Sequence, residues 1–178
     1  MGAYAPAPVV TEAVEKRVLE EIVYPTIRGM AAEGCPYQGV LYVGLMIDAE
    51  GAPRVVEFNV RFGDPEAQVV LPMIESDLAP VLFSAAAGDL GDCDWRLRSD
   101  PHVGVVMASG GYPGSYEVGF PIAGLESATS IPGVHIVHAG TALQDDTFIT
   151  KGGRVITVVA RGSSYGEAVS RAYESVGL

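Results

Sequence analysis

Apolar residues recur along the first half of the chain with two periods, and each period predicts a different element. Between Thr11 and Gly34 they recur at helical spacing, which predicts a helix that Thr11 caps, that Pro25 kinks or splits, and that ends at Gly34. Residues 40–48 and 54–61 are rich in β-branched and aromatic side chains instead. A short loop with Gly and Pro joins these two runs, so together they predict an antiparallel hairpin.

Two further helices are predicted to begin at acidic residues. Asp64 stands where an N-cap is expected, and Pro65 follows at the first helical position. Asp77 is predicted to cap a second helix that ends near Gly88. Residues 79–87 of this second helix are almost all apolar, which predicts that the helix is buried.

A polar, turn-rich and aperiodic stretch at residues 88–102 predicts a domain boundary. We therefore expect two domains, residues 1–95 and 96–178. The second domain ends in a helix predicted at residues 165–176 with Ser164 as its cap. Its β-prone runs alternate with Gly-rich loops and lie at residues 103–108, 134–138 and 154–160. The predicted fold class is α+β: an antiparallel sheet with helices, followed by a small mixed α/β domain.

Composition excludes several classes of protein. The 178 residues are 48% apolar, which is enough to form a core. The chain has 11 Lys and Arg against 22 Asp and Glu, a net charge of −11, which argues against nucleic acid and anionic membrane surfaces as partners. No apolar run approaches the roughly 18 residues of a membrane span. Cys35 and Cys93 form no metal pattern, and we expect reduced thiols in a cytoplasmic protein.

The strongest chemical signal lies at Glu57, Asn59 and Arg61, which alternate with apolar residues. On a strand these three side chains project from one face. A carboxylate and an amide oxygen placed in this way can share a hard cation such as Mg²⁺, and Arg61 would reach the charge that the cation leaves on a ligand. The pattern alone fits a solvated strand face with a Glu57–Arg61 pair as well, and favours it.

The segment Glu57-x-Asn59-x-Arg61 is similar to the metal-binding strand of ATP-grasp enzymes. The longer string 57–66 resembles the phosphoribosylamine-glycine ligase (glycinamide ribonucleotide synthetase) family. Other segments resemble this family in order and spacing; they are residues 1–10, 41–48, 110–114, 138–141 and 152–155. The resemblance implies the second half of an ATP-grasp domain followed by a C-terminal domain that lacks its last segment.

The resemblance also implies a reaction, an ATP-dependent carbon–nitrogen ligation of purine biosynthesis. ATP would phosphorylate the glycine carboxylate, and the amine of 5-phosphoribosylamine would attack the glycyl phosphate. The products are glycinamide ribonucleotide, ADP and phosphate. In this scheme Glu57 and Asn59 hold Mg²⁺ or Mn²⁺ on the ATP phosphates, and Arg61 is a catalytic residue at the transferring phosphoryl group.

Three more residues receive roles from the same resemblance. Leu45 would pack against adenine, and Asp64 and Glu66 would form the glycine or amine side of the pocket. Their sequence context fits simpler roles equally well: core packing for Leu45, an N-cap for Asp64 and a first-turn acid for Glu66.

Length is the main departure from the family, because this chain is less than half as long as a typical member. The resemblance implies that the missing N-terminal half carries the rest of the ATP site, so we expect the chain alone to be inactive and to need that half in cis or in trans. Two alternatives stay open. One is a fragment of another ATP-grasp carboxylate–amine ligase, and the other is a non-catalytic module that binds a cation or another ligand.

Overall fold

The computed structural model describes residues 1–91 and 93–178, and its mixture of helices and antiparallel strands confirms the α+β class. These residues form two compact units, each built from separate stretches of chain. The first, which we call the sheet unit, comprises Met1–Pro6, Asp64–Met73 and Arg98–Leu178. The second, the hairpin unit, comprises Ala7–Gly63 and Ile74–Leu97. The boundary between residues 95 and 96 concerns sequence domains and stays a prediction; Asp92, within the predicted linker, lies outside the described residues.

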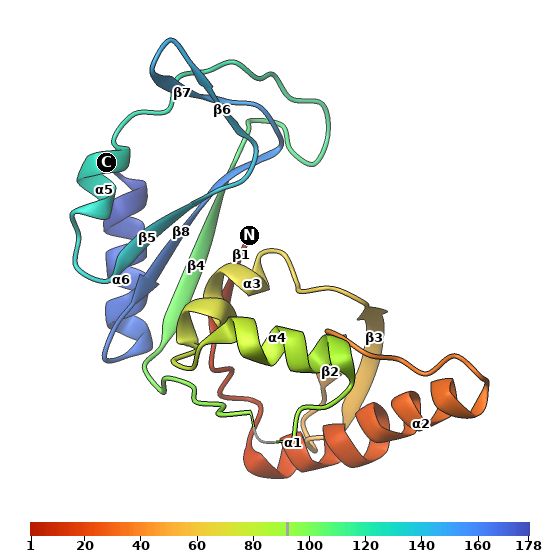
Figure 1. The fold of residues 1–178 in the computed structure, drawn as a ribbon. Coiled ribbons are helices and arrows are strands. Elements are labelled where there is room, and N and C mark those ends of the chain that lie inside the picture. The colour runs from red at the N-terminus through yellow and green to blue at the C-terminus, as the bar shows by residue number, and fades with distance from the viewer. Residues whose placement is uncertain (92) are drawn as a thin grey trace. The chain divides into compact units, whose positions relative to one another are not determined.

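The sheet unit is built on four antiparallel strands in the order β1-β4-β8-β5. Their bounds are β1 Gly2–Ala5, β4 His102–Ala108, β8 Arg154–Arg161 and β5 Val134–His138. Helix α6 (Tyr165–Val176) packs along this sheet (Figure 1). A cluster of buried apolar side chains lies between them; its members are Val134, Val158, Ala160 and Ala172.

The predicted C-terminal helix is confirmed, because its local signals agree with its packing. The Ser164 hydroxyl accepts a hydrogen bond from the Glu167 amide at 3.2 Å and caps the first turn. Ala168 and Ala172, four positions apart, lie fully buried on the face toward the sheet.

Several elements of the sheet unit were not predicted. Strand β1 is short and pairs with β4, about a hundred positions away in the sequence. A second hairpin turns at Asp145 and Asp146, both in the left-handed region at φ 47° and 61°. The strands of this hairpin are β6 Thr141–Gln144 and β7 Thr147–Thr150, and α5 Leu125–Thr129 was not predicted either. The helix predicted after Asp64 and Pro65 is present, as α3 Glu66–Val70 and a 3₁₀ turn Leu71–Met73.

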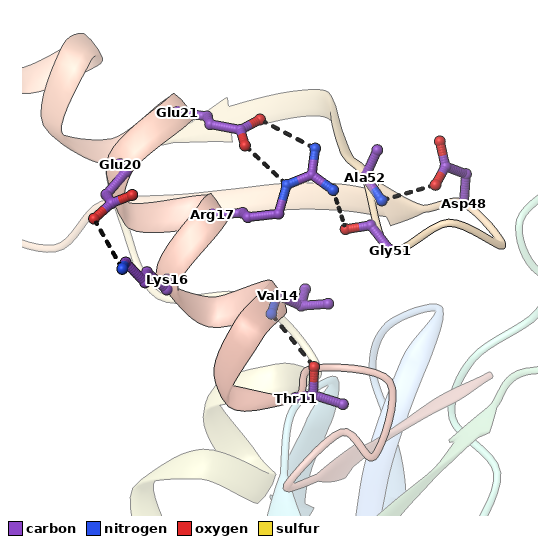
Figure 2. A network of polar contacts seen from close by, with 9 residues as sticks. All are labelled: Thr11, Val14, Lys16, Arg17, Glu20, Glu21, Asp48, Gly51 and Ala52. Atoms are coloured by element: carbon purple, nitrogen blue, oxygen red, sulfur yellow. Dashed lines mark hydrogen bonds and ion pairs between the residues drawn. The ribbon is translucent and has the colours of Figure 1, made fainter.

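The hairpin unit begins with the predicted helix, which runs as α1 (Glu12–Val18), a π-helical turn (Leu19–Val23) and α2 (Tyr24–Ala32). Thr11 caps α1, and its hydroxyl accepts from the Val14 amide at 3.3 Å (Figure 2). Pro25 lies in the first turn of α2 and has no amide hydrogen to donate. The predicted split is therefore found just before Pro25, at the π-helical turn.

The predicted hairpin is formed by β2 (Tyr42–Ile47) and β3 (Pro53–Asn59). Helix α4 (Leu78–Ala87) has the predicted Asp77 cap, which accepts from the Ala79 amide at 3.0 Å. The prediction that this helix is buried is wrong. Phe83 is 78% exposed, because the described part of the hairpin unit supplies no layer over this face.

Two further observations concern membranes and thiols. Across residues 1–91 and 93–178, no helix combines the length and the apolar character needed to cross a membrane. Cys35 and Cys93 are both free, as expected for reduced thiols.

Candidate functional site

Strand β3 presents Glu57 and Asn59 on one face of the hairpin, as the alternation predicted. Asn59 lies opposite Tyr42 and Glu57 lies opposite Gly44 in the register with β2. Directly opposed residues share a face, so the Glu57 side chain extends over Gly44. A Cβ built on Gly44 would come within 3.0 Å of Glu57 Cγ. The glycine therefore leaves the space that this carboxylate stem uses, a role that the sequence pattern did not indicate.

A β-bulge interrupts the hairpin beside this pair. The register shifts between Gly44 and Leu45, so that Leu45 opposes Val55 and Val56 is the additional residue on β3. Leu45 is half-buried and follows Gly44 directly, so strand alternation directs it to the face opposite Glu57. Glu57 and Leu45 are thus not brought together on one face of the hairpin.

Arg61 lies beyond the end of the strand, which corrects the predicted strand over 54–61. Strand β3 ends at Asn59 because its partner strand starts at Tyr42, directly opposite. The Arg61 guanidinium nevertheless turns back to Asn59: Nη2 donates to Asn59 Oδ1 at 3.3 Å, and Nη1 donates to the Phe62 carbonyl at 2.8 Å. A Glu57–Arg61 pair is not found among the ion pairs of the described residues, so Arg61 is associated with the amide and not with the carboxylate.

The donor set at Glu57 and Asn59 fits an open magnesium or manganese site. It offers one exposed carboxylate and one amide oxygen, and an amide oxygen that accepts from Arg61 keeps a second lone pair. Mg²⁺ is held by one or two protein oxygens when waters and substrate phosphates complete its coordination. In the described part of the chain no three His, Cys, Asp or Glu side chains cluster in a way that would hold a metal ion. The residues therefore do not suit a metal enclosed by protein ligands alone.

Asp64 belongs to the sheet unit, and its partners differ from those predicted. Helix α3 has Pro65 at its N-cap position without a side-chain cap, so the prediction that Asp64 caps this helix is wrong. The Asp64 carboxylate instead accepts from Gln68 Nε2 at 2.8 Å and pairs with Arg154 Nη1 at 3.3 Å. Arg154 Nη1 also donates to the Asp64 carbonyl at 2.6 Å. The carboxylate of Asp64 therefore pairs with Arg154 of a distant strand, whereas the N-cap preference of aspartate predicted a bond to a backbone amide of α3.

Arg154 is the residue that sequence reasoning missed. It begins β8, 90 positions from Asp64, and no local pattern connects the two. Its Nε donates to the Tyr112 hydroxyl at 3.0 Å. This hydrogen bond, followed by the charge on Asp64, raises the pKa of Arg154 above its usual value. The guanidinium stays protonated and keeps both partners.

Glu66 occupies the first turn of α3, where a carboxylate favours the positive end of the helix. The predicted site residues are therefore divided between the two compact units. The sheet unit contains Asp64 and Glu66, and the hairpin unit contains Leu45, Glu57, Asn59 and Arg61. Contacts within the units join Asn59 to Arg61 and Asp64 to Arg154.

Comparison with known proteins gives a consistent assignment along the chain. Residues 1–67 match the family model of the phosphoribosylglycinamide synthetase ATP-grasp (A) domain, and residues 102–177 match that of the phosphoribosylglycinamide synthetase C domain. The phosphoribosylamine–glycine ligase of Pseudomonas aeruginosa is 51% identical over 97% of this chain and 40% of its own length. That of Vibrio parahaemolyticus is 48% identical over 98% of this chain and 40% of its own length.

A solved structure agrees with these matches. The crystal structure of phosphoribosylamine–glycine ligase from Thermotoga maritima superposes with a TM-score of 0.80 at 31% identity, covering 99% of this chain and 42% of that protein. The chain thus spans about 40% of the length of the bacterial relatives it matches. On the two family models together, the chain belongs to the phosphoribosylglycinamide synthetase family.

Proposed function

We propose that this chain supplies the metal-binding strand and the C domain of an ATP-dependent ligase that joins glycine to 5-phosphoribosylamine. The products would be glycinamide ribonucleotide, ADP and phosphate, and the reaction belongs to purine biosynthesis. The names of its relatives support this substrate pair, since each is a phosphoribosylamine–glycine ligase. We propose a cytoplasmic location from the two unpaired thiols, Cys35 and Cys93.

The observation that carries the proposal is the position of two oxygen donors, Glu57 and Asn59, in the segment that matches the ATP-grasp domain. Glu57 and Asn59 share one face of β3, and Gly44 leaves room for the carboxylate. Mg²⁺ or Mn²⁺ bound there would neutralise charge on the phosphates of ATP. Either ion suits this donor set.

Arg61 is proposed to act beside these ligands as the catalytic cation. Its guanidinium is exposed and already oriented by Asn59 Oδ1 and the Phe62 carbonyl. A guanidinium presents several donors in one plane, which suits the oxygens of a transferring phosphoryl group or an acyl phosphate. Catalysis of phosphoryl transfer depends mainly on such positioning and charge stabilisation.

The remaining roles are proposed by family resemblance. Leu45 contributes apolar surface for adenine, and Asp64 and Glu66 contact glycine or the amine of phosphoribosylamine. Asp64 is already oriented by Arg154 and Gln68, as a substrate ligand would need to be.

A further part of the enzyme is proposed to complete the site, in cis or in trans. The apolar side chains of β3 and of the residue that follows it stay open within the hairpin unit: Val56 is 65% exposed, Phe58 43% and Val60 73%. Exposed apolar surface of this kind marks a place that another protein segment covers. Because ATP must be enclosed and both reactants held, the chain alone is expected to show negligible turnover.

The test is a complementation assay that measures ADP formation. The chain is mixed with the separately expressed N-terminal part of the Pseudomonas aeruginosa relative, together with ATP, Mg²⁺, glycine and freshly prepared phosphoribosylamine. We expect turnover from the mixture and from neither part alone. Glu57→Ala should abolish it, whereas Glu50→Ala, an exposed carboxylate in the turn of the same hairpin, should not.

Substrate replacement separates this proposal from its rivals. Another carboxylate–amine ligase would turn over with a different small acid in place of glycine. Saturable binding of a ligand by the chain alone, with no turnover in any mixture, would indicate a binding module. Turnover by the chain alone that Glu57→Ala abolishes would overturn the claim that a further part is required.

A further inference from the structure

The Gly-rich segments of the sheet unit converge on the start of β8. The Ser109 amide donates to the Gly153 carbonyl and the Ser109 hydroxyl to the Gly152 carbonyl, both at 2.8 Å. From the other side, the Gly140 amide donates to the Arg154 carbonyl at 2.8 Å. Two segments that lie apart in the sequence are therefore hydrogen-bonded to one short stretch, residues 152–154.

Close packing at this stretch requires glycine. A Cβ on Gly140 would lie 2.6 Å from the Arg154 carbonyl oxygen, and a Cβ on Gly153 would lie 2.3 Å from the ring carbon Cδ2 of Tyr112. Neither distance is compatible with a side chain unless the neighbour moves. The missing side chain of Gly153 thus allows Tyr112 to lie against the backbone just before Arg154, and that of Gly140 allows the close approach of two backbone segments.

The outcome of this packing is a well-defined position for one guanidinium. Arg154 Nε donates to the Tyr112 hydroxyl at 3.0 Å, while Nη1 donates to the Asp64 carbonyl at 2.6 Å and lies 3.3 Å from Asp64 Oδ2. One side chain therefore holds both the main chain and the carboxylate of Asp64. Gln68 completes the arrangement by donating to the other carboxylate oxygen at 2.8 Å.

We propose that Arg154 is a positioning residue, which the glycine segments and Tyr112 hold in place so that it orients Asp64 toward its substrate. This inference rests on the proposed function for the substrate role of Asp64. The fixing of Asp64 by Arg154, which we call the hold, depends only on contacts within the sheet unit. The proposal also assigns one role to the segments at 110–114, 138–141 and 152–155, which is to support Arg154.

The hold is measured without substrate, by hydrogen exchange of the full chain. Arg154→Gln should speed exchange at the amides of residues 64–70 roughly tenfold, while the amides of β4, β5 and β8 keep their protection. Tyr112→Phe removes only the hydroxyl and should have a smaller effect in the same segment. Arg161→Gln is the matched control, because Arg161 also lies on β8 and pairs with an aspartate, Asp100, at 3.9 Å. It should leave residues 64–70 unchanged.

The orienting role is measured by kinetics in the complementation mixture. Arg154→Gln should raise KM for glycine or for phosphoribosylamine roughly tenfold and leave KM for ATP within about twofold. A residue with only a structural role would lower the amount of active enzyme and leave every KM unchanged. Tyr112→Phe should raise the same KM by a smaller factor, whereas Arg161→Gln should change neither KM.

Each outcome decides a separate claim. Unchanged exchange at residues 64–70 in both Arg154→Gln and Tyr112→Phe overturns the hold. Faster exchange with every KM unchanged overturns the orienting role. If Arg154→Gln lowers hydrogen-exchange protection throughout the sheet, the Tyr112→Phe variant alone decides whether Arg154 holds Asp64, because this change removes a single oxygen atom. An unsubstituted mixture without turnover overturns the proposed function, whereas the exchange result still decides whether Arg154 holds Asp64.

Discussion

Gly44 lies directly opposite Glu57 on the β2–β3 hairpin, and a methyl group on Gly44 would come within 3.0 Å of Glu57 Cγ. Such a contact is tighter than most Cβ contacts in folded proteins, so the stem of Glu57 would have to shift by a few tenths of an ångström. The proposed metal ligand is therefore placed by the absence of a side chain on the neighbouring strand.

Gly44→Ala should accordingly weaken the proposed metal site while the fold is kept. We expect a loss of roughly tenfold in Mn²⁺ affinity, the effect typical when the support of a metal ligand is disturbed. This affinity is measured by titrating the complementation mixture with Mn²⁺ in the presence of ATP. The electron paramagnetic resonance signal of free Mn²⁺ reports how much of the ion is unbound. Gly29→Ala is the control, because a Cβ at Gly29 meets nothing within 4 Å. Equal affinities in the two variants would contradict the role of Gly44.

Arg17 should make the stability of the hairpin unit depend on pH. Its Nε donates to Glu21 Oε1 at 2.8 Å and its Nη1 to the Gly51 carbonyl at 3.0 Å, joining α1 to the hairpin turn (Figure 2). The hydrogen bond from Arg17 lowers the pKa of Glu21 below 4.5. The stabilisation is thus present above about pH 4.5 and is lost as the pH falls through the lowered pKa of Glu21.

Thermal unfolding of Arg17→Met at pH 7 and pH 3 tests this linkage. We expect a lower melting temperature than that of the unsubstituted chain at pH 7 and a smaller difference at pH 3, where only the bond to the Gly51 carbonyl is still lost. Lys16→Met is the matched control, since among the described residues Lys16 pairs with the exposed Glu20 alone, at 3.9 Å. A difference for Arg17→Met that is the same at both pH values would show that Glu21 contributes nothing.

Local signals predicted the elements whose caps and packing faces lie close together in the sequence. The bounds of α6 follow from Ser164 and from the buried pair Ala168 and Ala172, all within nine positions. By contrast, β1 depends entirely on a partner strand about a hundred positions away, so its own four residues could not reveal it.

In the candidate site, too, features set by neighbouring residues were predicted and features set by distant residues were not. Strand alternation correctly predicted that Glu57 and Asn59 share one face, because this depends only on the two-residue period within β3. The cap prediction for Asp64 failed because Arg154, far away in the sequence, takes the carboxylate. The bulge at Gly44 and Leu45 also escaped prediction, since it is a property of the pairing of two strands and not of either one.

Ser164→Ala should destabilise the sheet unit by about 1 kcal/mol, the usual effect of removing an N-cap side chain. The Ser164 hydroxyl accepts from the Glu167 amide at 3.2 Å, and without it that amide loses its protein partner at the helix start. Urea unfolding followed by circular dichroism measures the change. Ser170→Ala, an exposed position within the same helix, should be neutral or slightly stabilising because alanine favours helix interiors. Equal effects at the two serines would count against the cap.

Gly153→Ala tests whether the tight packing beneath Tyr112 is required. The added Cβ would meet the Tyr112 ring at 2.3 Å, so the ring must move and its hydroxyl must leave Arg154 Nε. We expect a destabilisation of about 1–3 kcal/mol, as for overpacked interiors, together with faster hydrogen exchange at residues 64–70.

Gly110→Ala is the matched change in the neighbouring Gly-rich segment, where a Cβ meets nothing within 4 Å. It should alter stability by no more than about 0.5 kcal/mol and leave exchange at residues 64–70 unchanged. If Gly153→Ala destabilised the sheet without affecting residues 64–70, the packing would serve the sheet alone. Faster exchange at residues 64–70 that is specific to Gly153→Ala would connect Gly153 to Asp64 through the side chains of Tyr112 and Arg154.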